Sequence, residues 1–95
     1  MELLQRVEFC IAGKVQGVSF RKYTQRQALS LGVAGWVKNE LDGTVCGVLE
    51  GPAEQVEQMQ QWLKTTGSPN CRIAQATFHT VDITRMSYID FIIKK

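Results

Sequence analysis

The segment at residues 13–22, GKVQGVSFRK, combines two glycines four residues apart with the adjacent cations Arg21 and Lys22. It lies where an alternating, strand-like run ends and a helical pattern begins, so it predicts a loop that leads into a helix N-terminus. Positive potential at that end of a helix disfavours each exposed cation by roughly 0.3–1 kcal/mol. The two charges are therefore either solvated, or they share a negative ligand with the backbone N–H groups of the loop.

The loop has two interpretations. In the first, the glycines only let the chain turn, and the stem of Arg21 packs on the sheet. In the second, the glycines let the backbone approach a ligand, consecutive N–H groups bind an anion, and Arg21 adds a planar fork suited to phosphate oxygens. The second interpretation joins three independent effects at one place.

The familiar phosphate-site motifs do not fit this segment. Only three residues separate Gly13 from Gly17, and no Gly-Lys-Ser/Thr follows, which excludes a Walker loop; the dinucleotide fingerprint also fails. A phosphatase with a cysteine nucleophile six residues before its arginine would need cysteine where this chain has Val15. Ser19 has no histidine or carboxylate close to it in sequence that could act as a base.

The elements around the loop predict the fold. The expected order is strand, helix, strand, strand, helix, strand and a final strand, with strands at 7–13, 34–40, 44–50, 72–83 and 88–93 and helices at 20–31 and after Gly51-Pro52. This order predicts an α+β fold, a ferredoxin-like βαββαβ sandwich with a mainly antiparallel sheet, two helices on one face and an extra C-terminal strand. Residues 1–95 are expected to form a single domain.

Local signals refine this expectation. Asp42-Gly43 predicts a tight hairpin in which both turn positions have positive φ. Pro52 is expected at the first position of the second helix, where its missing N–H costs nothing. The residues expected to face the core at period two or at helical spacing are Val7, Phe9, Ile11, Phe20, Thr24, Ala28, Leu31, Val56, Met59, Trp62 and Leu63.

Charge and cysteine content bound the environment. The net charge of +2 gives no bulk electrostatic signal for a nucleic acid or membrane partner. The three cysteines, Cys10, Cys46 and Cys71, are odd in number and lack a C-x-x-C spacing, so they are predicted to be buried reduced thiols rather than a disulfide framework or a zinc site. The N-terminus shows no signal peptide or membrane span, and a cytoplasmic location is expected.

Two segments resemble the two signatures of the acylphosphatase family. GKVQGVSFR at 13–21 is similar to the first signature, G-x-V-Q-G-V-x-F-R. GWVKNELDGTVCGVLEG at 35–51 is similar to the second, in which glycine, an aromatic residue and Lys-Asn precede Gly-x-Val and a later glycine. The resemblance extends along nearly the whole chain. It implies a small ferredoxin-like enzyme that hydrolyses acyl phosphates to carboxylate and inorganic phosphate, with no metal and no cofactor.

The resemblance also implies residue roles. Arg21 corresponds to the arginine that holds the phosphoryl group, and Asn39 to the asparagine that positions the attacking water. The phosphate-binding loop corresponds to the backbone of Gln16, Gly17, Val18, Ser19 and Phe20. The expected partners are a small acyl phosphate as substrate and inorganic phosphate as product and inhibitor, and the expected state is a monomer.

Several other polar or aromatic residues have plainer interpretations. His79 is expected on the surface of a strand, Asp42 in the hairpin turn, and Lys38 in solvent, like Lys22. For Trp36 the sequence leaves two possibilities, packing or contact with substrate.

A binding function competes with the enzymatic one. RNA-binding modules share the βαββαβ order and stack bases on aromatic residues of the two central strands. Here those strands are 7–13 and 44–50, and their one aromatic residue, Phe9, alternates with core positions. A small-molecule regulatory module of the same fold remains a second alternative.

Overall fold

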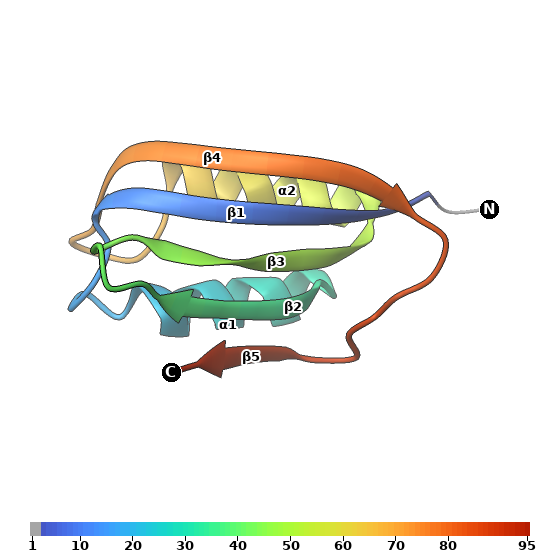
Figure 1. Ribbon diagram of the computed structural model, residues 1–95, viewed down its shortest axis with the longest axis horizontal. Helices are drawn as coiled ribbons and strands as arrows, with labels where there is room; N and C mark the ends of the chain where they lie inside the picture. The colour runs from blue at the N-terminus through green and yellow to red at the C-terminus, as the bar shows by residue number, and fades with distance from the viewer. Residues whose placement is uncertain (1–2) are drawn as a thin grey trace.

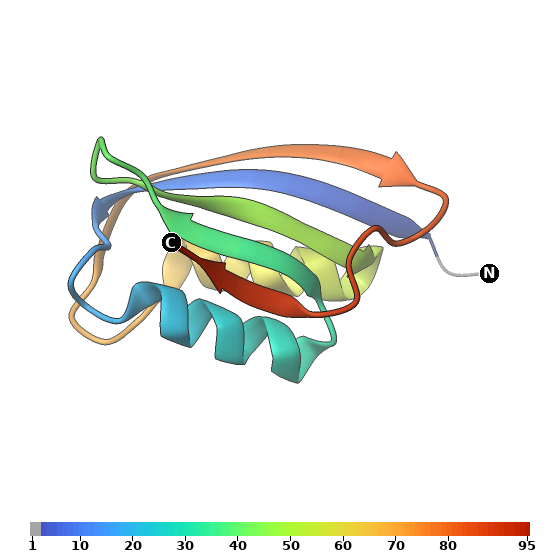
Figure 2. The same cartoon turned by 60° about the horizontal axis from the view of Figure 1, so that its bottom comes forward.

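The computed structural model describes residues 3–95 and consists of one sheet covered on a single face by two helices. Figure 1 shows the strands side by side, and Figure 2 shows both helices packed beneath them. The elements in chain order are β1 (Leu4–Lys14), α1 (Phe20–Leu31), β2 (Ala34–Asn39), β3 (Val45–Pro52), α2 (Ala53–Thr65), β4 (Arg72–Ile83) and β5 (Phe91–Lys94). Neither described helix is long and apolar enough to cross a membrane.

The sheet has the order β4-β1-β3-β2-β5. The central strands β1 and β3 are antiparallel, β4 and β2 flank them in antiparallel pairing, and β5 pairs with β2 in parallel. Figure 1 shows the long connection that carries the chain from the end of β4 around to β5. The predicted ferredoxin-like sandwich with an additional C-terminal strand is therefore confirmed.

The core lies between the sheet and the helices. Val7, Phe9 and Ile11 are buried from β1, as their period of two predicted. The helices contribute Phe20, Thr24, Ala28, Val56, Met59 and Leu63, and β5 contributes Phe91. Trp62 is partly buried against this cluster. The binary pattern of the sequence thus identified the core-facing side of β1, α1 and α2.

Two local predictions need correction. The turn between β2 and β3 is longer than a two-residue hairpin, because the Glu40 N–H donates to the Thr44 carbonyl at 2.8 Å and the Gly43 N–H donates to the Glu40 carbonyl at 3.1 Å. Within this turn only Gly43 has a positive φ, 93°. Asp42 instead accepts hydrogen bonds from the Thr44 hydroxyl and N–H, which lower the pKa of its carboxyl group. Pro52 ends β3 and caps α2 rather than entering its first turn.

The prediction of three buried reduced thiols is also wrong. Cys10 and Cys46 form a disulfide, and Cys10 is exposed; Cys71 is a free, partly buried cysteine. The physical reason is register: Cys10 lies directly opposite Cys46 in the β1–β3 pair, with the Cα atoms 4.1 Å apart. Both alternate with core residues and therefore share the face of the sheet that the helices do not cover.

A buried carboxylate fixes the connection to β5. Glu50 is fully buried on β3 and accepts hydrogen bonds from Arg6 Nε at 2.7 Å, the Ser87 N–H at 2.6 Å and the Tyr88 N–H at 3.2 Å. These contacts use the backbone donors at 87 and 88, and β5 begins only at Phe91 rather than at the predicted residue 88. The network satisfies a buried charge and directs the chain back alongside β2.

Candidate active site

A cavity of about 400 Å³ lies at one end of the sheet, where the loop after β1 meets the ends of β2 and β5. Figure 1 shows the loop after β1, the ends of β2 and β5 and the start of α1 at the same side of the molecule. The residues that line the cavity are Val15, Gly17, Ser19, Phe20, Arg21, Lys22, Asn39 and Ile93. The fold therefore brings together the two predicted catalytic residues, which are eighteen positions apart in the sequence.

The loop at 15–19 has an alternating backbone. Gly17 and Ser19 have φ values of 75° and 59°, whereas residues 16, 18 and 20 do not have positive φ. Such alternation turns successive N–H groups toward one point and is typical of an anion-binding nest. Within the described residues, the N–H groups of 16–20 donate to no backbone or side-chain acceptor. Their donors are available to a ligand.

Gly13 sets the start of this loop. Its φ is 132°, and a Cβ atom there would overlap the Arg72 carbonyl oxygen of β4. The register between β1 and β4 shifts at this position, which marks a bulge. Gly13 therefore serves the departure of the chain from the sheet, whereas Gly17 serves the conformation of the loop itself.

Arg21 is held from the far end of the chain. Its Nη1 donates to the Lys94 carbonyl of β5 at 3.2 Å, and its side chain is partly exposed at the cavity wall. β5 is itself tied to α1, because Gln25 Nε2 donates to the Phe91 carbonyl at 2.8 Å. The first turn of α1 contains no acidic residue that could neutralise Arg21. The guanidinium is thus positioned by one hydrogen bond, and it makes no ion pair with the residues that the structure describes.

Asn39 is the last residue of β2 and contributes a side-chain amide to the same cavity. Its Oδ1 is buried and has no hydrogen-bond partner among residues 3–95. Buried polar atoms are nearly always paired, so an orphaned acceptor of this kind indicates a place for a ligand or a water molecule.

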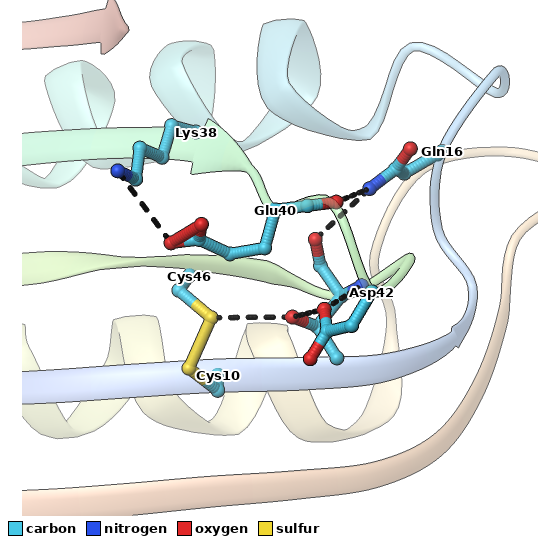
Figure 3. Close-up of a disulfide and its surroundings, with 7 residues drawn as sticks. Cys10, Gln16, Lys38, Glu40, Asp42 and Cys46 are labelled. Carbon is cyan, nitrogen blue, oxygen red and sulfur yellow. Dashed lines mark hydrogen bonds and ion pairs between the residues drawn. A yellow bond between two sulfur atoms is a disulfide. The ribbon is translucent and has the colours of Figure 1, made fainter. Parts of the chain in front are cut away.

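The sequence predicted only a backbone role for Gln16, but its side chain also joins two parts of the site. Gln16 Nε2 donates to the Glu40 carbonyl at 2.9 Å and to the Thr44 carbonyl at 3.0 Å (Figure 3). These carbonyls belong to the turn that follows Asn39. The amide therefore holds the candidate phosphate loop against the segment that carries the candidate water-positioning residue.

Of the three other residues Lys22, Lys38 and Trp36, only Lys22 lines the cavity. Lys22 is exposed, lines the cavity and makes no ion pair within the described chain. Lys38 Nζ forms an ion pair with Glu40 Oε1 at 3.6 Å. Trp36 lies outside the cavity, donates to the Tyr88 hydroxyl at 3.2 Å and has Lys94 Nζ over its ring at 4.2 Å, which favours packing over substrate contact.

His79 is exposed on β4, as predicted, and does not line the cavity. No group of three or more His, Cys, Asp or Glu residues within 3–95 is arranged to hold a metal ion. The polar side chains that line the cavity are those of Ser19, Arg21, Lys22 and Asn39.

Comparison with known proteins agrees with this geometry. A family model described as acylphosphatase matches residues 7–93. Acylphosphatase-1 of Mus musculus is 50% identical over 95 residues, covering 99% of this chain and 96% of that protein, and Acylphosphatase-1 of Gallus gallus is 46% identical with the same coverage. The crystal structure of acylphosphatase from Bacillus subtilis superimposes with a TM-score of 0.89 at 30% identity, covering 96% of this chain and 99% of that one.

Proposed function

The chain belongs to the acylphosphatase family of hydrolases, and we propose that it cleaves the carboxyl–phosphate bond of small acyl phosphates in the cavity described above. One observation supports the proposal: Arg21 and Asn39 line the same cavity as Gly17, Ser19 and Phe20, next to loop N–H groups at 16–20 that have no hydrogen-bond partner within residues 3–95. The products are a carboxylate and inorganic phosphate, and phosphate also competes for the same loop.

In the proposed complex the phosphoryl oxygens occupy the nest of the loop, and Arg21 offsets their charge. A guanidinium about 4 Å from a phosphoryl oxygen is worth on the order of 4 kcal/mol per unit charge at an effective dielectric constant near 20. The N-terminus of α1 adds a favourable dipole. The bound anion thereby offsets the repulsion between Arg21 and the positive potential at the N-terminus of α1.

Asn39 then positions a water in line with the leaving oxygen. Phosphoryl transfer depends mainly on such alignment and on electrostatic stabilisation of the transferred group. The leaving carboxylate has a conjugate acid with a pKa of about 4–5, comparable to a glutamate side chain, so it departs without a general acid. Loop, arginine and asparagine therefore suffice for the proposed reaction.

The test is phosphate release from acetyl phosphate and benzoyl phosphate in the presence of EDTA. We expect activity in the wild type, loss of most activity in Arg21→Gln, and a fall of about 10²–10³ in kcat for Asn39→Ala, by analogy with removal of an oriented oxyanion donor. Arg26→Gln is the matched control, because Arg26 is exposed on the same helix and lies outside the cavity. It should retain full activity.

The outcomes separate the alternatives. Equal rates in wild type, Arg21→Gln and Asn39→Ala would refute the site assignment while leaving the hydrolase activity in place. An inactive wild type that is correctly folded would favour a binding module of the same fold.

A further inference from the structure

The Cys10–Cys46 disulfide joins β1, which leads into the loop of the candidate site, to β3, which follows the turn after Asn39. β1 runs directly into the loop at 15–19, and β3 begins directly after the turn at 40–44. We propose that this pair is a reversible thiol–disulfide exchange site, attacked at Cys10 by glutathione or a protein dithiol, and that its state controls how firmly the turn is held. The proposal concerns a modification site and does not depend on the hydrolase activity.

The disulfide is open to an incoming thiol. Figure 3 shows it in front of the strands with the helices behind, on the uncovered face of the sheet. Both cysteines line a groove of about 310 Å³ whose other walls include Glu8, Trp36 and His79. A bridge buried in the core would be inert, whereas exposure of a disulfide makes it more labile.

The two sulfurs differ in their surroundings. Cys10 is exposed, whereas Cys46 is partly buried. Cys46 Sγ lies 3.4 Å from Thr44 Oγ1, and in the β2–β3 register Cys46 lies opposite Lys38. An attacking thiolate therefore reaches Cys10 more readily, which makes Cys46 the leaving group.

The exchange proceeds in two balanced steps. The thiolate of the attacking molecule bonds to Cys10 Sγ, the Cys10–Cys46 bond breaks, and Cys46 Sγ leaves with the electron pair and takes a proton from solvent. A second thiol then attacks the mixed disulfide and releases Cys10. The two electrons come from the two attacking thiols, which end as a disulfide.

Reduction acts on the turn through Thr44. The new Cys46 S–H can donate to Thr44 Oγ1, whose own proton lies toward Asp42 Oδ1 at 2.6 Å. The Thr44 carbonyl accepts from the Gln16 side chain. Cleavage removes the covalent link between two residues 36 positions apart, and the turn then keeps only its hydrogen bonds to Gln16 and within itself.

The first experiment uses a Cys71→Ala background, so that only the pair can react. After equilibration with oxidised glutathione, alkylation and mass spectrometry should find no free thiol; after dithiothreitol they should find two. The melting temperature should fall on reduction by on the order of 10–20 °C. A Cys10→Ser/Cys46→Ser variant in the same background is the control and should melt at one temperature in both buffers. Two free thiols after oxidation, or equal melting temperatures, would overturn the proposal.

A second experiment tests the direction of attack. In the Cys71→Ala background, Cys46→Ser leaves Cys10 as the one thiol and Cys10→Ser leaves Cys46. Cys10 should react several-fold faster with an aromatic disulfide reagent, and peptide mapping of the wild type under limiting glutathione should place the adduct on Cys10. Equal rates, or an adduct mainly on Cys46, would contradict the assigned polarity.

A third measurement tests the link to the turn. Hydrogen exchange of the Glu40 and Gly43 amides, both hydrogen-bonded in the turn, should quicken on reduction in the wild type. It should not respond to dithiothreitol in the double serine variant. Unchanged exchange in the wild type would show that the disulfide is not coupled to the turn.

Discussion

At the scale of single residues, Ser19 carries the least common backbone conformation of the loop. Its φ and ψ are 59° and 27°, and its side chain is exposed and makes no capping hydrogen bond to α1. Left-handed conformations of residues other than glycine are uncommon and concentrate at functional sites, where surrounding structure maintains them. The hydroxyl of Ser19 is therefore less important than the direction in which this conformation turns the neighbouring N–H groups.

Two substitutions of Ser19 are expected to give opposite results. Ser19→Val places a β-branched side chain in the left-handed region, and we expect it to destabilise the fold by about 1–2 kcal/mol and to weaken phosphate binding. Ser19→Gly accepts the conformation freely and should stay within about 1 kcal/mol of the wild type with activity retained. Urea unfolding with phosphate titration checks both. If Val and Gly behave alike, the left-handed geometry is not what the loop requires.

At the scale of elements, Gln16 explains how two loops from different strands act as one site. Its two hydrogen bonds span 24 and 28 positions of the sequence and connect the loop after β1 with the turn after β2. The turn carbonyls also accept bonds from Gly43 and Glu40 within the turn, so they stay paired when the glutamine is removed. The side chain therefore contributes mainly to the relative placement of the loop and Asn39.

We accordingly expect Gln16→Leu to lower kcat more than its cost in stability suggests. Loss of two ordinary hydrogen bonds should cost about 1–3 kcal/mol of unfolding free energy. Misplacement of a reacting group by about 1 Å can cost on the order of 10²-fold in rate. Gln5→Leu is the matched control, because Gln5 is on β1 and bonds to Asp82 away from the cavity. A normal kcat in Gln16→Leu would show that the Gln16 side chain does not position the loop relative to Asn39.

The sequence predicted elements where one local pattern decides the structure. The predicted bounds of the helix at 20–31 were both correct, because its apolar period begins at Phe20 and Gly32 follows its last turn. The start of β5 was wrong, because the apolar run at 88–93 does not reveal that Glu50 uses the N–H groups of Ser87 and Tyr88.

In the candidate site, too, the local motifs were predicted from the sequence, whereas the contacts between distant segments were not. The loop and Asn39 lie in two local motifs, and the structure brings both to one cavity. The contact of Arg21 with the Lys94 carbonyl spans 73 positions, and the Cys10–Cys46 pairing depends on strand register. Composition and spacing do not determine either, because register follows from which faces are buried and how the turns close.

At the scale of the whole molecule, the fold places Arg21, Lys22 and the start of α1 at one cavity. The net charge is only +2, so attraction of an anion depends on the local arrangement of Arg21, Lys22 and the N-terminus of α1. Because the cavity is built from the loop after β1 and from α1, β2 and β5, it exists only when most of the domain is folded. Binding there should therefore stabilise the entire fold.

Inorganic phosphate provides the corresponding test, through linkage between binding and unfolding. At one hundred times its dissociation constant it should add about 2.7 kcal/mol to the unfolding free energy. For a domain of this size that corresponds to a rise of roughly 10–20 °C in the melting temperature. Arg21→Gln should lose most of this rise, and Arg26→Gln should keep it.

The control must separate binding from salting effects, since phosphate also stabilises folded proteins by exclusion from their surface. Sodium chloride at matched ionic strength accounts for screening, and the Arg21→Gln protein accounts for exclusion, because its surface is otherwise the same. A bound anion saturates at low concentration, whereas exclusion grows steadily with concentration. An equal, non-saturating rise in wild type and Arg21→Gln would mean that phosphate does not occupy the loop.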